Sequence, residues 1–190
     1  AAIGTADENT DTAQHTMPEF GLLSRLRHLD LACCRQLADV AALEHCQGLL
    51  FLSLRECRAV SSLSELSACV QLRELVLNGC RSLDPGALHQ VGRCISLVKL
   101  SISNIRGLTD IEGLRGCTKL ERLDLGGCRT LRAINALSDL RQSLRWLNLN
   151  GCEKLDDISA LAGSPALHTV NLSFCSGKST CLDAQTPVYT

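Results

Sequence analysis

Residues 120–128, Leu-Glu-Arg-Leu-Asp-Leu-Gly-Gly-Cys, contain a pattern that returns through most of this chain. The pattern is Leu-x-x-Leu-x-Leu-x-x-Cys or a close variant, and its copies follow one another every 23 to 25 residues. A fixed period of this length indicates a solenoid, in which each repeat packs only against its neighbours. The seven copies begin at Leu26, Leu49, Leu72, Leu97, Leu120, Leu144 and Leu167.

Each repeat divides into two halves with different periodicity. The Leu-x-Leu segment alternates and predicts a strand with one buried face. The second half carries apolar residues three apart, as in Leu108, Ile111 and Leu114, which favours a 3₁₀ turn or short helix. The third copy is longer and contains Asp84-Pro85-Gly86, and proline is well tolerated in the first turn of a helix. We therefore expect an α-helical turn over residues 85–91.

These halves predict an α/β solenoid with a curved parallel sheet on its concave face and short 3₁₀ or helical turns on its convex face. We expect the solenoid to span residues 17–175 after a disordered segment, 1–16, that is rich in Thr, Asp and Ala. Met17, Phe20 and Leu23 are in phase with a convex half-repeat and predict a partial N-terminal cap. Residues 176–190 form a tail. Either it covers the last repeat, or the chain is a piece of a longer protein, which we favour.

Ten of the twelve cysteines occupy repeat positions. Six follow the strand and four lie late in the convex half; in order these are Cys34, Cys57, Cys80, Cys128, Cys152 and Cys175, and then Cys46, Cys69, Cys94 and Cys117. Neighbouring parallel strands are about 4.8 Å apart, so distance alone does not exclude disulfides between these cysteines. Side chains in a ladder point the same way rather than at each other, which is a poor geometry for a disulfide. We expect buried free thiols, which suit a reducing compartment and a cytoplasmic location.

The composition narrows the classes of partner and cofactor. The formal net charge is −1, so nothing indicates a nucleic-acid footprint or a membrane-surface patch. No apolar stretch approaches the roughly 20 residues needed to cross a bilayer, and residues 1–16 do not resemble a signal peptide. The chain has no Cys-x-x-Cys, and its five histidines are scattered, so we expect no metal and no cofactor.

The repeats resemble the cysteine-containing leucine-rich repeats, best known from F-box-type ubiquitin-ligase receptors. The resemblance rests on both cysteine positions and on the turns Leu108-Thr109-Asp110 and Leu155-Asp156-Asp157, and it covers nearly all of residues 26–175. Most copies are shorter than that family's repeat, and no F-box-like helical segment precedes them. The Leu-x-Leu-x-Gly-Cys runs also resemble leucine-rich proteins of trypanosomatid parasites. What the resemblance implies is the fold.

The outward residues of the strands are the predicted binding surface for a protein partner whose identity the sequence does not give. Interfaces draw most of their energy from a few aromatic and arginine anchors, and Phe51 and Trp146 are the aromatics at these positions. Isolated exposed aromatics are also common without any partner. The candidate residues are Arg27, His28, Asp30, Phe51, Ser53, Arg55, Glu74, Asn78, Lys99, Ser101, Arg122, Asp124, Trp146, Asn148, Asn150 and Asn171.

Two classes of function follow. The first is a non-catalytic protein-interaction scaffold, which needs only the solenoid. The second is a recognition or regulatory part of a larger enzyme, such as a ubiquitin ligase, with its chemistry outside this chain. No motif in the chain places a nucleophile beside a base or brings carboxylates together, so we expect no catalysis here.

Overall fold

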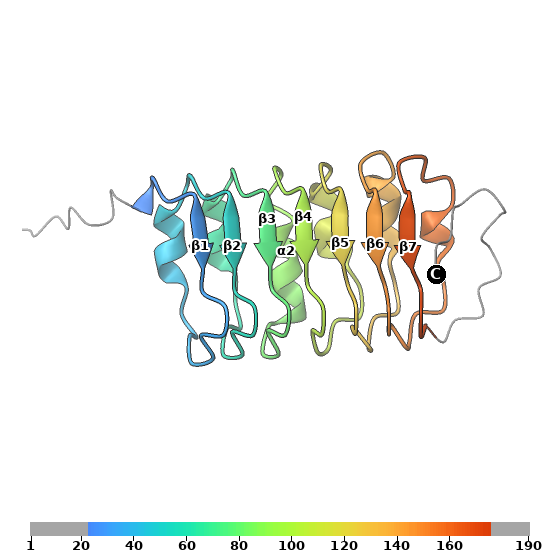
Figure 1. Cartoon of the computed structure of the whole chain (residues 1–190), viewed down its shortest axis with the longest axis horizontal. Coiled ribbons are helices and arrows are strands. Elements are labelled where there is room, and N and C mark those ends of the chain that lie inside the picture. The colour runs from blue at the N-terminus through green and yellow to red at the C-terminus, as the bar shows by residue number, and fades with distance from the viewer. Residues whose placement is uncertain (1–22, 176–190) are drawn as a thin grey trace, which may run out of the picture.

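The computed structural model describes residues 23–175, which form a single row of seven parallel strands (Figure 1). The strands follow one another in chain order, so each pairs only with the strands of its neighbouring repeats. They are β1 (His28–Asp30), β2 (Phe51–Ser53), β3 (Glu74–Val76), β4 (Lys99–Ser101), β5 (Arg122–Asp124), β6 (Trp146–Asn148) and β7 (Thr169–Asn171). The sequence predicted six or seven parallel strands, and this is confirmed.

The register is the same at every strand pair. The middle residue of each strand pairs with the middle residue of the next, as Leu52 does with Leu75 and Leu123 with Leu147. Because side chains alternate along a strand, this register sends every middle residue into the core and both of its neighbours outward. Leu52, Leu75 and Leu147 are fully buried, as their place in the pattern predicted.

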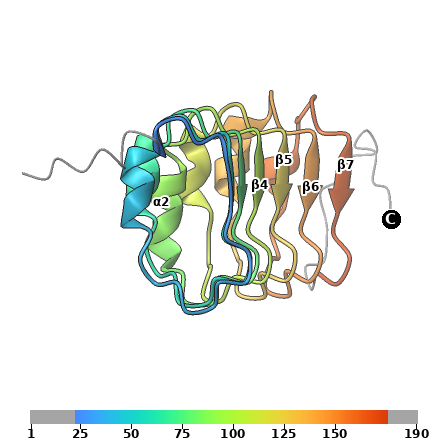
Figure 2. The same ribbon diagram turned by 60° about the vertical axis from the view of Figure 1, so that its left-hand side comes forward.

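Short turns of helix lie on the side opposite the strands, which we call the convex side (Figure 2). They are η1 (Ala41–His45), η2 (Ser64–Ala68), η3 (Pro85–Ala87), α2 (Leu88–Val91), η4 (Glu112–Gly116), η5 (Asn135–Leu140) and η6 (Ser159–Leu161). All are 3₁₀ helices except α2. The apolar residues spaced by three point inward from these turns, and Leu108, Ile111 and Leu114 are at most 1% exposed.

The third repeat has the longest convex turn, because η3 runs directly into α2. The Asp84 carboxylate accepts a hydrogen bond from the Gly86 N–H at 2.8 Å, and Pro85 follows in the first turn. An acidic N-cap and a proline at the first position are both favourable helix starts. The predicted α-helical turn is confirmed for Leu88–Val91, whereas Pro85–Ala87 form a 3₁₀ turn that leads into it.

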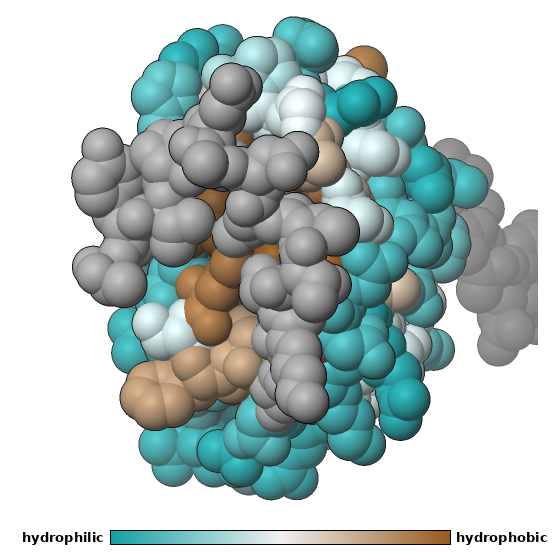
Figure 3. Space-filling model, turned by 90° about the vertical axis from the view of Figure 1, so that its right-hand side faces the viewer, coloured by the Kyte–Doolittle hydropathy of each residue, from teal (hydrophilic) through white to brown (hydrophobic). Residues whose placement is uncertain are grey.

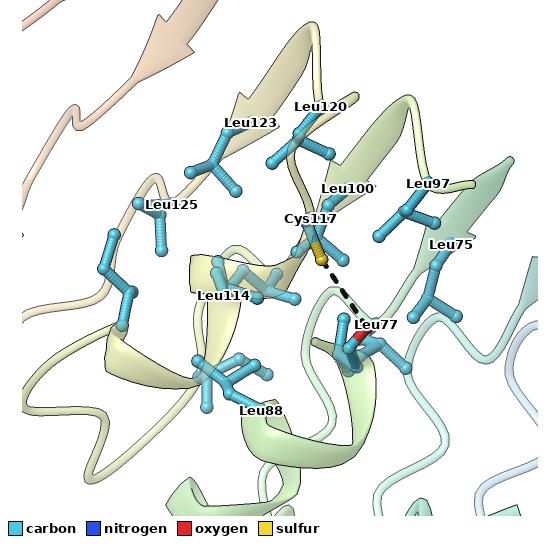
Figure 4. Close-up of a cluster of buried hydrophobic side chains, with 14 of the residues drawn as sticks. Leu75, Leu77, Leu88, Leu97, Leu100, Leu114, Cys117, Leu120, Leu123 and Leu125 are labelled. Carbon is cyan, nitrogen blue, oxygen red and sulfur yellow. Dashed lines mark hydrogen bonds between the residues drawn. The ribbon is translucent and has the colours of Figure 1, made fainter. Parts of the chain in front are cut away.

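The core is a stack of leucine layers between the strands and the convex turns (Figure 4). Leu97, Leu100 and Leu120 come from the strand side, whereas Leu88 and Leu114 come from the convex side. Full burial of one such side chain contributes about 1.5–3 kcal/mol. At the end of the row beyond β7, apolar surface shows within a polar rim (Figure 3), and Phe174 near this end is 82% exposed.

Every repeat turns after its strand through a residue in the left-handed region. The turn residues are Cys33, Glu56, Gly79, Asn104, Gly127, Gly151 and Phe174, all with φ between 57° and 74°. Each stands immediately before the cysteine position of its repeat, or before Ile105 in the fourth. A shared conformation at one position keeps the repeats superimposable along this edge.

The cysteines after the strands tie successive repeats together. Cys57 donates its S–H to the Leu31 carbonyl at 3.1 Å, and Cys80 donates to the Leu54 carbonyl at 3.0 Å. The same bond to the preceding repeat recurs at Cys128, Cys152 and Cys175, with distances of 3.2, 3.4 and 3.1 Å. Four of these five carbonyls, such as those of Leu31 and Leu54, also accept the backbone N–H of the cysteine position in their own repeat. The thiol therefore adds a second hydrogen bond, one that crosses from the next repeat.

The convex cysteines repeat the arrangement with longer bonds. Cys69, Cys94 and Cys117 donate to carbonyls of the preceding convex turn at 3.5, 3.6 and 3.5 Å, the last drawn in Figure 4. The eleven cysteines among residues 23–175 are free thiols. The predicted burial is wrong for Cys34, which is exposed, because no described repeat precedes it to cover the thiol. Cys175 is only half-buried.

Several predictions concern residues outside the described range. The disordered segment 1–16, Met17 and Phe20 of the N-terminal cap, and the tail 176–190 all fall there. Leu23 is described, and it packs partly buried against the core, in keeping with its predicted phase.

Native thiol labelling should separate exposed from buried cysteines. Burial raises the pKa of Cys80 to about 12, and only the thiolate is an effective nucleophile. At pH 8 iodoacetamide should modify Cys33 and Cys34 quickly, whereas Cys80 should react only after unfolding, as read by mass spectrometry of proteolytic peptides. Comparable rates at all three would contradict the assigned burial.

The same shift predicts a pH dependence of stability. The pKa of Cys80 rises from an ordinary value of 9.0 to about 12, so the folded state holds its proton between these limits while the unfolded state loses it. The free energy of unfolding should therefore fall as the pH rises above about 9. Urea titrations at pH 8 and pH 10 measure the difference, and Cys80→Ala should reduce it.

Candidate protein-binding surface

The exposed side of the sheet carries two rows of side chains, one on each side of the buried middle residue. We call this side the strand face. Its first row holds His28, Phe51, Glu74, Lys99, Arg122, Trp146 and Thr169. Its second row holds Asp30, Ser53, Val76, Ser101, Asp124, Asn148 and Asn171.

The aromatic residues of the first row each stack on a neighbour one strand away. The Arg122 guanidinium carbon lies 4.7 Å from the centre of the Trp146 ring, in cation–π geometry. The Phe51 ring lies 4.0 Å from the His28 ring, and the two planes differ by 5°. Both aromatics are half-buried, so they are held in place while one part of each ring stays accessible.

The first row also carries opposite charges side by side. The Lys99 ammonium lies 3.1 Å from a Glu74 carboxylate oxygen, across the β3–β4 pair. Between this pair and Trp146 the strand face is hollowed by about 220 Å³, lined by first-row and second-row residues of β3 to β6. Lys99, Arg122 and Trp146 thus surround one shallow depression.

The second row is largely occupied by structural hydrogen bonds. Asp30, Asp124, Asn148 and Asn171 each accept a bond from the backbone N–H two residues on, at 2.9–3.0 Å. These bonds close the turn that ends each strand, a role for which Asp and Asn are suited. The Ala32 N–H holds the pKa of Asp30 below its ordinary value, and a bond from Ser53 adds to this.

Asp124 is the centre of a small network within this row. Besides the Gly126 N–H, it accepts hydrogen bonds from the Ser101 hydroxyl at 3.1 Å and the Asn148 amide at 2.8 Å. Three strands are therefore cross-linked through one carboxylate. The side chains of this network contribute to the sheet more than to an outside partner.

Three of the predicted binding residues need correction. Ser53 is only 5% exposed, because its small side chain lies between the longer Asp30 and Val76. The Asn78 side-chain oxygen accepts a bond from the Ser103 N–H at 3.0 Å, a structural role. Arg27 donates to the Gly48 carbonyl at 2.8 Å and so ties the start of the first repeat to its last residue. The sequence pattern places such residues outward but does not reveal these partners.

The remaining predicted residues lie where the pattern put them. Arg55 is exposed and Asn150 is half-exposed, both just beyond the strand ends. Thr169 completes the first row at the same motif position as Trp146. An arginine that follows the cysteine position in each of the first five repeats was missed, and its regular spacing in the sequence was the available signal.

Two kinds of site are not found within residues 23–175. No helix there is long and apolar enough to cross a membrane. In the same range, no three His, Cys, Asp or Glu side chains are grouped in a way that would hold a metal ion.

The architecture matches known solenoid structures. Internalin C2 of Listeria monocytogenes matches with a TM-score of 0.65 at 23% identity, over 76% of this chain and 60% of that one. This is a leucine-rich-repeat fold. The leucine-rich-repeat domain of the type III effector XopL matches with a TM-score of 0.60 at 22% identity, over 85% of this chain and 65% of its own. Internalin F of Listeria monocytogenes gives a TM-score of 0.55 at 22% identity, over 82% of this chain and 50% of its own.

These matches concern the fold, and the chain spans less than two thirds of each of the three matched structures. No model of a known protein family and no curated protein matches the sequence. The predicted leucine-rich-repeat solenoid is thus confirmed by its structural neighbours.

Replacing Asn148 should show that the second row has a structural role. Asn148→Ala removes the bond to the Asn150 N–H and the bond to Asp124, so the free energy of unfolding should fall by about 1–3 kcal/mol. Urea denaturation followed by circular dichroism measures this loss. Asn135→Ala is the matched control, because its exposed side chain lies at the start of η5, and it should change stability by less than about 0.5 kcal/mol.

Proposed function

We propose that this leucine-rich-repeat chain is a non-catalytic scaffold that binds a partner protein on its strand face. The observation that carries the proposal is the first row. Its side chains lie on a rigid parallel sheet and pair with one another across neighbouring strands, as Arg122 does with Trp146 and Lys99 with Glu74. Solenoids of this kind present extended surfaces for binding.

Trp146 and Arg122 are the proposed anchors. Tryptophan and arginine are enriched among residues that dominate interface energy. The cation–π contact favours the paired arrangement of both side chains before any partner arrives, which reduces the conformational entropy lost on binding. Phe51, held by His28, would supply a second apolar contact four strands away.

The size of the hollow favours a macromolecular ligand over a small molecule. Sites for small molecules usually enclose about 300–1,000 Å³. The depression beside Trp146 measures about 220 Å³ and is open toward solvent, so it suits a protruding side chain of a partner. We propose a cytoplasmic setting because an array of free, hydrogen-bonded thiols is best maintained where thiols stay reduced.

Substitution of the anchors tests the proposal. Trp146→Ala and Phe51→Ala should each lower affinity for a partner by ~2 kcal/mol or more while leaving the fold nearly intact. The partner is first isolated with the wild-type chain by affinity capture and mass spectrometry, and its affinity is then measured for each purified variant by calorimetry.

Two variants serve as controls for this measurement. Leu147→Ala leaves a core cavity and should cost about 2–5 kcal/mol in stability, so it reports what general destabilisation does to binding. Arg115→Glu changes an exposed charge on the convex side. If Arg115→Glu or Glu112→Arg abolishes binding while the strand-face variants bind normally, the partner uses the convex face instead.

A further inference from the structure

A row of arginines follows the edge of the solenoid where the strands end. The residue after the cysteine position is arginine in five successive repeats, and we call these residues, Arg35, Arg58, Arg81, Arg106 and Arg129, the arginine row. Like charges on neighbouring repeats repel one another, so each needs a compensating anion or free exposure to water. The repeats differ in how they meet this requirement.

The second repeat supplies its own anion. Glu56 is the left-handed turn residue there, and its carboxylate accepts hydrogen bonds from Arg58 at 2.7 and 3.0 Å. That bond and the charges of Arg58, Arg81 and Arg35 hold the pKa of Glu56 below its ordinary value. One carboxylate thus lies in the field of three consecutive arginines.

The Glu56 carboxylate lies directly beside Gly79, in space that a side chain at that position would occupy. A Cβ atom at Gly79 of the next repeat would lie 2.4 Å from a Glu56 oxygen, which is too close for any real contact. Gly79 therefore leaves the space that the carboxylate occupies.

The fourth repeat has the same frame but no carboxylate. Asn104 stands at the position of Glu56, and its side-chain oxygen has the same relation to Gly127, where a Cβ atom would also lie 2.4 Å away. The three surrounding arginines are Arg81, Arg106 and Arg129. Among residues 23–175, Arg81 and Arg106 have no carboxylate within ion-pair distance, and Arg129 makes only an exposed 3.4 Å pair with Glu153.

A pocket lies at this place. It encloses about 410 Å³, and its lining includes all three arginines together with Asn104 and Thr130. The fourth repeat thus offers three positive charges and a neutral amide around open space, where the second repeat holds a bound carboxylate.

We propose that the Asn104 pocket binds a carboxylate side chain from an acidic segment of a partner protein. Glu56 provides the internal precedent, since it shows how a carboxylate fits between three arginines of this row. A guanidinium group has several N–H donors for a carboxylate, and at Arg58 two of them share one Glu56 oxygen. The inference rests on the proposed function only in assuming a protein partner, and it assigns a second contact region at the edge of the sheet.

The test uses fluorescein-labelled hexaglutamate as the probe and fluorescence anisotropy at low ionic strength as the measurement. Hexaglutamate should bind the wild-type chain, and hexaglutamine should not. Asn104→Glu should weaken hexaglutamate binding about tenfold, because the introduced carboxylate fills the pocket as Glu56 fills its own. Glu56→Asn should strengthen hexaglutamate binding, because it opens a second pocket of the same kind.

Gln142→Glu is the matched control, since it converts an exposed amide to a carboxylate away from the arginine row. Equal losses for Asn104→Glu and Gln142→Glu would mean that only net charge matters and would overturn the proposal. Arg106→Gln, which should weaken binding, and Arg93→Gln, which should not, give a second comparison that does not rely on Asn104. Failure of hexaglutamate to bind, with inorganic phosphate bound instead in an Asn104-dependent way, would also overturn it.

The measurement distinguishes this inference from the proposed function. Hexaglutamate binding needs no natural partner, so it can fail while capture of a partner through Trp146 succeeds. Hexaglutamate can also bind while no partner binds through Trp146. The two results are separable because different substitutions change the arginine row and the first row.

Discussion

The constant register of the parallel strands is the constraint on which this molecule depends. Each strand is only three residues long, so a slip of one residue would turn its buried leucine outward and leave the layer empty. Because Leu52, Leu75 and Leu100 pair in one column, the convex turns, thiols and left-handed turn residues also align from repeat to repeat. Every other regularity of the structure follows from this alignment.

Alignment converts positions in the sequence into rows on the surface. The first row becomes an uninterrupted strip of side chains, and the second becomes a line of turn-closing bonds. The arginine row arises in the same way at the strand ends. Equivalent positions in different repeats can then be compared directly. Glu56 and Asn104 occupy the same position in the second and fourth repeats, so the surroundings of Glu56 show what the Asn104 position can hold.

The fold was predictable from the sequence because leucine spacing reports burial directly. The strands and the 3₁₀ turns were found this way, and the helical turn after Asp84 was found from Asp84-Pro85-Gly86 in the longer third repeat. The roles of polar residues were less accessible, since an outward position does not reveal a partner two residues or one repeat away. Asn148 and Arg27 show this: both were predicted to face outward toward a partner, yet both make hydrogen bonds to the chain's own backbone. Cys34 shows the complementary limit, because burial at the end of a row depends on what stands beside it.

The left-handed turn carries an energetic consequence along the whole edge. Glycine adopts this conformation freely. For a residue with a side chain, the left-handed conformation costs roughly 1–2 kcal/mol of folding free energy, and for asparagine the cost is smaller. Three of the seven turns use glycine, and the other four hold Cys33, Glu56, Asn104 and Phe174. A version with glycine at all seven would gain stability and keep the same core, but its edge would present bare backbone. The non-glycine turn residues thus give each repeat a different side chain at this edge, and they lower the stability of the fold.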